Sequence, residues 1–103
     1  MNCAVELSPL AIRDLEDIVE HLTSEGGRKL QKRFRQHLKD KLSLLADYPQ
    51  LGTPRHFTRI GALRWTAVED FPNHLVFYTL NEAERRLRIE RILHGARNLD
   101  ELI

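Results

Sequence analysis

Two apolar stripes of helical spacing, separated by Gly26-Gly27, constrain the fold of this 103-residue chain more than any other feature. The stripes comprise Ala11, Leu15, Ile18 and Leu22, and then Leu30, Phe34, Leu38, Leu42 and Leu45. Glycine takes the left-handed backbone conformation cheaply, so the glycine pair ends the first helix, and the short turn sends the next helix back antiparallel. Ser8 can cap the first helix and Pro9 suits its first turn. The pattern predicts a helical hairpin that ends before Pro49.

The two predicted helices differ in charge. Residues 13–25 contain five acids and one base, whereas residues 28–41 contain seven bases and one acid. Opposite charges favour antiparallel pairing, but exposed ion pairs contribute only about 0–1 kcal/mol each, so the apolar seam must dominate. The basic face is either a solvated surface or a site for nucleic acid or an acidic partner. The net charge of +1 argues against a dedicated nucleic-acid binder.

The strands of the predicted sheet flank this hairpin. Residues 4–7 favour a short first strand, residues 63–68 alternate in polarity, and residues 74–80 are apolar on both faces as in a central strand. Ile89, Ile92 and Leu93 give residues 88–94 the β-branched and apolar character of a strand that stops at Gly95. The prolines and glycines of residues 48–61 predict a loop that can end in a short strand. The last strand breaks strict alternation at Ile92, so either a β-bulge shifts its phase or both faces are partly covered.

The element order β-α-α-β-β-β predicts an α+β fold in which the helical hairpin packs on a mostly antiparallel four-stranded sheet. A chain of this length fits one domain over residues 1–103. No apolar run approaches the roughly 20 residues of a membrane helix, and residues 1–7 do not resemble a signal peptide, so we expect a cytoplasmic protein that meets no membrane. The lone Cys3 is expected to act as a small apolar residue.

A cationic group near the C-terminus is the main candidate for function. It combines His94 with four arginines, namely Arg64, Arg88, Arg91 and Arg97. If Arg64 and Arg88 share a face of the sheet, they form a patch that can bind phosphates or carboxylates through paired hydrogen bonds. Alternatively, the arginines pair with nearby acids of the chain itself. The five histidines are scattered without metal-ligand spacing, so we expect no metal and no cofactor.

Four segments carry a resemblance to a known family. The run RILHGAR at residues 91–97, preceded by PNHLVFY at residues 72–78, resembles the C-terminal signature of ParE-type toxins of the RelE/ParE toxin–antitoxin superfamily. Residues 8–15 are similar to the opening of that family's first helix, and residues 45–52 to the loop after its helices. The resemblance covers nearly the whole chain and implies the same α+β architecture.

The resemblance also implies alternative functions. ParE-type toxins inhibit DNA gyrase by stabilising its cleaved-DNA complex, which inhibits growth and stabilises plasmids, whereas RelE-type toxins are ribosome-dependent mRNA endoribonucleases. RNA cleavage needs an acid, a base and cations. The chain has no lysine after Lys41 and no tyrosine after Tyr78, which leaves His94 as the only catalytic candidate. We therefore expect a gyrase inhibitor that is not an enzyme, with a RelE-type nuclease and a non-toxic interaction module of the same fold as alternatives.

Partners and contacts follow from the resemblance. The target, DNA gyrase, is expected to meet Arg64, Arg88, Arg91 and Arg97, with Trp65 as an apolar anchor, while DNA is contacted only indirectly. A cognate antitoxin is expected to cover apolar side chains of the helical hairpin, namely Leu15, Val19, Leu22, Phe34 and Leu38. Before it binds, exposed apolar surface would favour a homodimer or a co-purified complex with the antitoxin.

Overall fold

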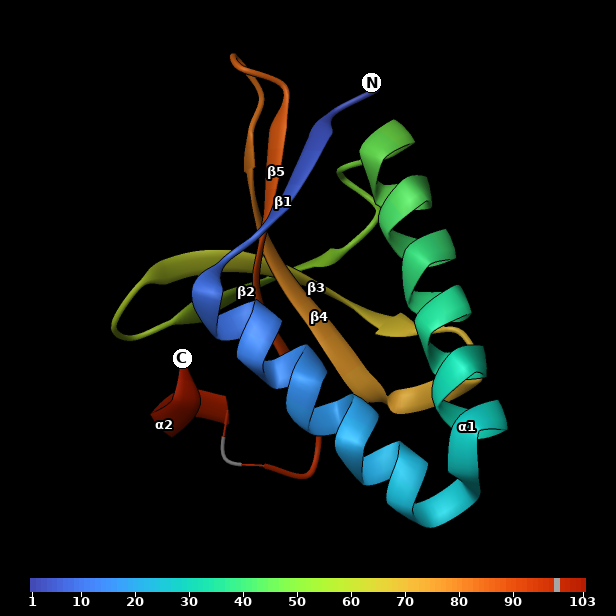
Figure 1. Cartoon of the computed structure of the whole chain (residues 1–103). Helices are drawn as coiled ribbons and strands as arrows, with labels where there is room; N and C mark the ends of the chain where they lie inside the picture. The colour runs from blue at the N-terminus through green and yellow to red at the C-terminus, as the bar shows by residue number, and fades with distance from the viewer. Residues whose placement is uncertain (98) are drawn as a thin grey trace.

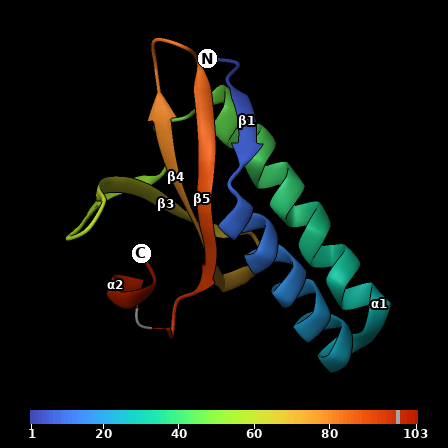
Figure 2. The same ribbon diagram turned by 60° about the vertical axis from the view of Figure 1, so that its left-hand side comes forward.

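The computed structural model describes residues 1–97 and 99–103, and within them it contains a five-stranded sheet, one long bent helix and one short helix (Figure 1). The elements in chain order are β1 (Ala4–Leu7), α1 (Pro9–Asp47), β2 (Thr53–Phe57), β3 (Gly61–Val68), β4 (Phe71–Asn81), β5 (Arg86–His94) and α2 (Leu99–Leu102). Helix α1 covers one face of the sheet and α2 lies on the opposite side (Figure 2). The predicted α+β fold is therefore confirmed.

Helix α1 is the predicted helical hairpin. Its backbone leaves the helical conformation at Gly27, where φ is 74° and ψ is −167°, and the chain turns back there into a second arm (Figure 1). We call residues 9–26 the first arm and residues 28–47 the second arm. The Ser8 hydroxyl accepts a hydrogen bond from the Ala11 N–H at 3.0 Å, as an N-cap does, and Pro9 occupies the first turn.

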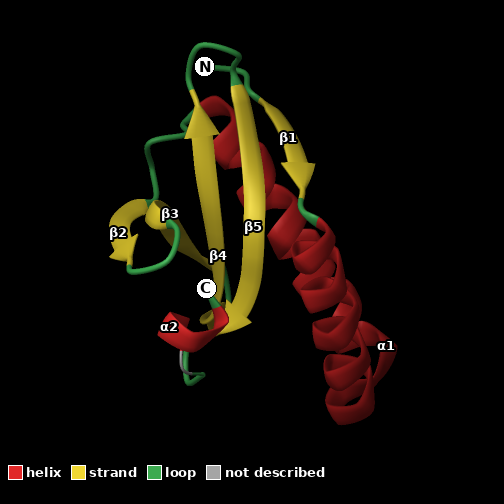
Figure 3. Cartoon of the chain, turned by 90° about the vertical axis from the view of Figure 1, so that its left-hand side faces the viewer, coloured by secondary structure: helices red, strands yellow, loops and turns green. Residues whose placement is uncertain are grey.

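The sheet has the strand order β1-β5-β4-β3-β2, and every pair is antiparallel except β1 with β5 (Figure 3). The prediction of four strands was wrong, because residues 53–57 form β2 within the segment expected to be mostly loop. Pro54 lies in this edge strand, where its missing N–H costs no ladder hydrogen bond on the open side. Pairing with β3 therefore overrides the loop composition of the segment.

A β-bulge explains the irregular pattern of the last strand. Tyr78 pairs with Ile89, but the next residue back, Phe77, pairs with Arg91, so Glu90 is the extra residue. This shift places both Ile89 and Ile92 in the core under α1. The bulge alternative is thus confirmed, and both faces of the strand are covered as well.

Apolar clusters lie on both faces of the sheet. On the α1 side the cluster includes Leu22, Phe34, Leu38, Leu45, Val76, Tyr78, Ile89 and Ile92. On the other side it comprises Phe57, Leu63, Phe77, Leu93, Leu99 and Ile103, with Trp65 and Leu75 packed against it. The C-terminal residues Leu99 and Ile103 therefore dock back on the sheet, whereas Asn98 lies outside the described residues.

Candidate functional site

The sheet separates Arg64 and Arg88, which would form one cationic patch only if they shared a face. Arg64 pairs with Tyr78, and Tyr78 pairs with Ile89 on the next strand. Cross-strand partners share a face, and successive residues alternate, so Arg64 lies on the α1 side and Arg88 on the opposite side. The condition for a shared patch of Arg64 and Arg88 is therefore not met, and the reason is strand register, which the sequence does not show.

Arg64 is engaged by the loop that follows α1. Its Nη1 donates hydrogen bonds to the backbone oxygens of Gly52, at 2.7 Å, and Gln50, at 3.1 Å. The neighbouring Trp65 is partly buried against the cluster on the other side of the sheet. Both residues, expected at the target interface, make contacts that position β2 and the loop before it.

Arg91 is held in a buried ion pair with Asp14 of the first arm. Its Nε donates to one Asp14 carboxylate oxygen at 2.8 Å, its Nη2 donates to the other at 2.9 Å, and the Ile92 N–H also donates to Asp14 at 3.0 Å. The hydrogen bonds that Arg91 donates to the Asp14 carboxylate raise the pKa of Arg91 above its ordinary value. Only 13% of the Arg91 side chain and 10% of the Asp14 side chain are exposed, so this pair serves the fold.

Asp14 was missed by the sequence analysis, although a signal for it exists. It lies three residues after Ala11 and four before Ile18, which places its carboxylate on the apolar face of the first arm. A carboxylate on an inward-facing position needs a buried partner, and a basic residue in the sheet is the natural one. The helical periodicity therefore indicated an internal ion pair, but not which arginine completes it.

Arg88 and Arg97 are the arginines of the predicted set with exposed side-chain positions. The Arg88 side chain is 47% exposed and lies 3.6 Å from the Glu90 carboxylate. Arg97 is exposed in the turn after β5, where its N–H donates to the His94 carbonyl at 3.1 Å. These two side chains remain the accessible members of the predicted target-binding group.

His94 faces a second histidine. Its ring lies 5.3 Å, between ring centroids, from that of His74 on β4, and its Nδ1 accepts a hydrogen bond from the Ala96 N–H at 3.1 Å. The pKa of His74 is lowered by burial, then by the neighbouring His94 and His21. Within the described residues, no group of three or more His, Cys, Asp or Glu side chains is placed to hold a metal ion.

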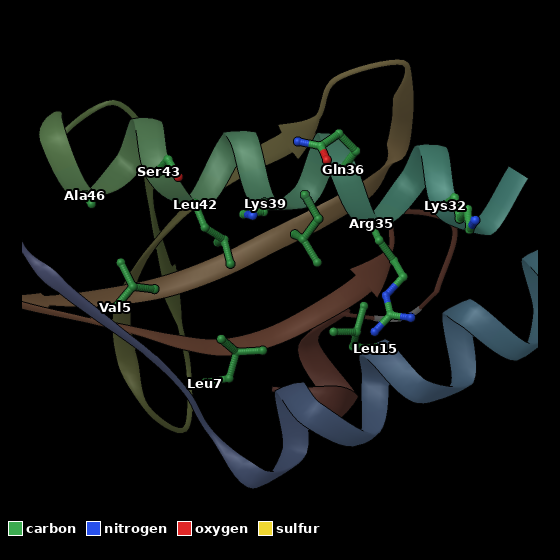
Figure 4. Close-up of a pocket in the computed structure, with 11 residues that line it drawn as sticks. Val5, Leu7, Leu15, Lys32, Arg35, Gln36, Lys39, Leu42, Ser43 and Ala46 are labelled. Atoms are coloured by element: carbon green, nitrogen blue, oxygen red, sulfur yellow. The ribbon is translucent and has the colours of Figure 1, made fainter. Parts of the chain in front are cut away.

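An apolar groove with a basic rim lies between β1 and the two arms of α1 (Figure 4). Its volume is about 740 Å³. The floor is formed by Val5, Leu7, Leu15, Leu38, Leu42 and Ala46, and the rim carries Lys32, Arg35, Gln36, Lys39 and Ser43. Figure 4 shows Arg35 of the second arm extending toward Leu15 of the first arm. We call this feature the α1 groove.

The structure divides the residues predicted to meet the antitoxin. Leu15 and Leu38 line the α1 groove, and Val19 is partly buried outside its lining. Leu22 and Phe34, which are 5% and 0% exposed, lie outside the lining because the centre of each apolar stripe faces the sheet. Leu38 is also buried, at 4% exposed, and contributes only to the floor of the groove. The lining that sequence reasoning missed, above all Val5 and Leu7 of β1, becomes adjacent to α1 only through the parallel pairing of β1 with β5.

Fold and topology define the class of protein to which the chain belongs: small α+β domains in which a helical hairpin covers a mostly antiparallel sheet. Residues 5–99 match the family described as the ParE toxin of the type II toxin–antitoxin system parDE. Because this match spans nearly the whole chain, the protein belongs to the ParE toxin family. No helix among the described residues is long and apolar enough to cross a membrane.

A solved structure shows the same fold. It is described as the chromosomal ParDE toxin–antitoxin system from P. aeruginosa, and the matched chain superposes with a TM-score of 0.72 and 17% sequence identity. The match covers 90% of this chain and 96% of that chain. A search of curated proteins finds no significant match.

Proposed function

We propose that this ParE-family toxin acts in the cytoplasm by inhibiting DNA gyrase, whose cleaved-DNA complex it stabilises. The observation that carries this proposal is the match to the ParE toxin family over residues 5–99. ParE-type toxins, as the sequence resemblance implies, act on gyrase without cutting nucleic acid themselves. The exposed guanidinium groups of Arg88 and Arg97 support the proposal, because each can hydrogen-bond to acidic groups of a target.

Such an inhibitor works by differential binding. It must bind gyrase with broken DNA strands more tightly than gyrase with resealed strands, because equal affinity for both states would shift no population. The toxin then needs no acid, base or metal of its own. Its surface must instead be complementary to a state of the enzyme that is normally short-lived.

We further propose that the cognate antitoxin binds in the α1 groove. The apolar floor suits the apolar face of an amphipathic segment, and the basic rim of Lys32, Arg35 and Lys39 suits acidic side chains along its border. Leu15 and Leu38 keep their predicted role in this arrangement, whereas Leu22 and Phe34 support the groove from the core.

Purified toxin incubated with gyrase, ATP and supercoiled plasmid, followed by detergent and protease, tests the proposed activity. We expect linear DNA that requires both toxin and gyrase. Folded toxin that leaves supercoiling and cleavage unchanged would contradict the gyrase proposal. Cleavage of mRNA on translating ribosomes, lost in a His94→Ala variant, would then identify the nuclease alternative.

A further inference from the structure

A second concave site lies on the side of β5 away from the α1 groove. Four parts of the chain that are distant in sequence meet there: the first turn of α1, the turn between β2 and β3, β5, and the C-terminal residues (Figure 1). The cleft has a volume of about 290 Å³, and its lining includes Leu10, Ile60, Arg88, Glu90 and Ile103. We call it the Arg88 cleft.

The walls of the Arg88 cleft are exposed apolar side chains. Leu10 and Ile60 are each 52% exposed, which is unusual for large aliphatic residues that lie on either side of one concavity. A single exposed leucine or isoleucine needs no explanation, but two that border one cleft form a surface on which a partner's apolar side chain can be buried.

Arg88 provides the polar contact of the cleft. Its Nε lies 3.6 Å from Glu90 Oε1, which is too long for a hydrogen bond, and its guanidinium group donates no hydrogen bond to the described residues. The Glu90 carboxylate already accepts a hydrogen bond from the Thr79 hydroxyl at 2.8 Å. Arg88 can therefore offer its planar pair of N–H groups to an incoming carboxylate.

We propose that the Arg88 cleft is the surface with which the toxin binds its target, and that its occupant is a protein segment carrying a carboxylate beside a large apolar side chain. The carboxylate binds Arg88, and the apolar side chain lies between Leu10 and Ile60. This inference deepens the proposed function and rests on it for the identity of the target as gyrase.

The chemistry of the cleft favours a protein segment over nucleic acid. The Glu90 carboxylate, 25% exposed and close to Arg88, opposes a phosphate and a carboxylate alike, so the preference comes from the apolar walls, against which a protein segment can bury a side chain next to its carboxylate. Leu10 and Ile60 offer nothing to a sugar–phosphate backbone. The net charge of +1 also provides little general attraction for DNA.

The Arg88 cleft and the α1 groove share no lining residue in the part of the chain that the structure describes. Substitutions can therefore alter one surface without touching the other. Arg88→Ala removes the proposed ionic contact, and Ile60→Asp places a charge in the proposed apolar contact. Arg86→Ala is the matched control, because Arg86 precedes Arg88 by two residues on β5, faces the same side and is 62% exposed outside the cleft.

The experiment measures three quantities for the wild type and these variants: the melting temperature, growth arrest on expression, and binding affinity by calorimetry for gyrase with and without DNA and for DNA alone. We expect melting temperatures close to the wild type for all variants. Arg88→Ala and Ile60→Asp should each weaken gyrase binding at least about tenfold and abolish growth arrest. Arg86→Ala should behave as the wild type.

Several results would overturn the inference. One is retention of growth arrest by both cleft variants at normal melting temperature. Another is binding of the wild type to DNA alone that both cleft variants lose, which would assign the cleft to nucleic acid. If the wild-type toxin arrests growth but does not bind gyrase, only the identity of the target is contradicted. Loss of growth arrest in the two cleft variants would then still support the Arg88 cleft as the target-binding surface, and its retention would contradict it. A wild type without any growth arrest would contradict both.

Discussion

The Asp14 carboxylate accepts hydrogen bonds from Arg91 and Ile92 on the part of β5 that β1 does not reach. The pairing of β1 with β5 stops at Ile89, and beyond it Asp14 accepts hydrogen bonds both from the Arg91 guanidinium and from the Ile92 N–H. The Ser8 hydroxyl similarly donates to the Glu90 carbonyl at 2.8 Å. The beginning of α1 thus satisfies the backbone of β5 where the sheet ends, and the helical hairpin is fixed to the sheet by this contact.

Replacement of Asp14 by alanine should lower the free energy of unfolding by about 3 kcal/mol, because it removes a buried carboxylate that accepts hydrogen bonds from the Arg91 guanidinium and from the Ile92 N–H. Urea denaturation followed by circular dichroism measures the change. Asp17→Ala is the matched control, since Asp17 is an exposed acid of the same arm, and it should change stability by less than about 0.5 kcal/mol. Equal effects of the two substitutions would remove the structural role assigned to Asp14.

Tyr78 fixes the loop after α1 from within the core. Its hydroxyl donates to the Pro49 carbonyl at 2.7 Å and accepts from the Gly52 N–H at 2.8 Å, while its side chain is fully buried. A Cβ on Gly52 would lie 2.5 Å from the Tyr78 hydroxyl oxygen. Gly52→Ala should therefore destabilise the protein by about 1–3 kcal/mol, as overpacking does in other cores, with a lower urea midpoint as the measurement.

Gly95→Ala provides the comparison for that substitution. A Cβ there would meet Leu75 Cδ1 at 3.4 Å, an ordinary contact, so we expect little change in the urea midpoint. Tyr78→Phe should also destabilise the protein, by about 1–3 kcal/mol, since it leaves two buried backbone groups unpaired. A Gly52→Ala variant as stable as the wild type would contradict the close contact between Gly52 and the Tyr78 ring.

The pH dependence of stability should carry a contribution from His74. Burial and the nearby His94 and His21 lower its pKa below the ordinary value of 6.5, and the rings of Phe34 and Phe71 pack against it. The unfolded chain therefore binds a proton near pH 6.5 that the folded protein binds only at lower pH. The stabilising contribution is complete above about pH 6.5 and is lost as the pH falls below it.

Urea midpoints at pH 7.5 and 5.5 test this expectation. The wild type should lose stability on acidification, and by less than the roughly 1.4 kcal/mol per pH unit of one full proton, because His74 is partly exposed and its interactions are screened. His74→Gln should reduce the loss, whereas His56→Gln, which changes an exposed histidine of β2, should not. An identical pH dependence in all three proteins would contradict the assignment to His74.

The sequence predicted the elements of this fold better than their lateral contacts. The stripes around Gly27 and the cap at Ser8 are local patterns, and they predicted the helical hairpin correctly. Strand β2, in contrast, depends on its pairing with β3, which outweighs the loop composition of residues 53–57. The same limit applied to the candidate site. The arginines were predicted to be site residues, but their division between core and surface follows from register and from the bulge at Glu90.

The antitoxin surface shows the same limit at the level of one helix. The apolar stripe of the second arm was predicted correctly, but a stripe contains residues that face the core and residues that border solvent. Phe34 belongs to the first kind and Leu42 to the second. Phe34 and Leu42 are distinguished only by where the sheet lies against the helix and by the position of Val5 of β1 beside Leu42 in the groove lining.

The basic rim of the α1 groove allows a test of the proposed antitoxin site that leaves the core intact. Replacing both Arg35 and Lys39 by glutamate reverses charge at the rim, so an acidic partner segment should associate more slowly and bind at least about tenfold more weakly at 0.15 M salt. The same change at Arg28 and Lys29, which are exposed in the second arm outside the groove lining, alters the net charge equally.

Association rates with the cognate antitoxin over a range of NaCl concentrations distinguish a local from a general charge effect. Attraction at the rim should make wild-type association slower as salt increases, and the Arg35/Lys39 double variant should lose most of that dependence. The Arg28/Lys29 double variant should keep it, because its substituted charges lie away from the groove. If both double variants weaken binding to the same extent, the antitoxin responds to total charge, and the α1 groove would no longer be supported as its binding site.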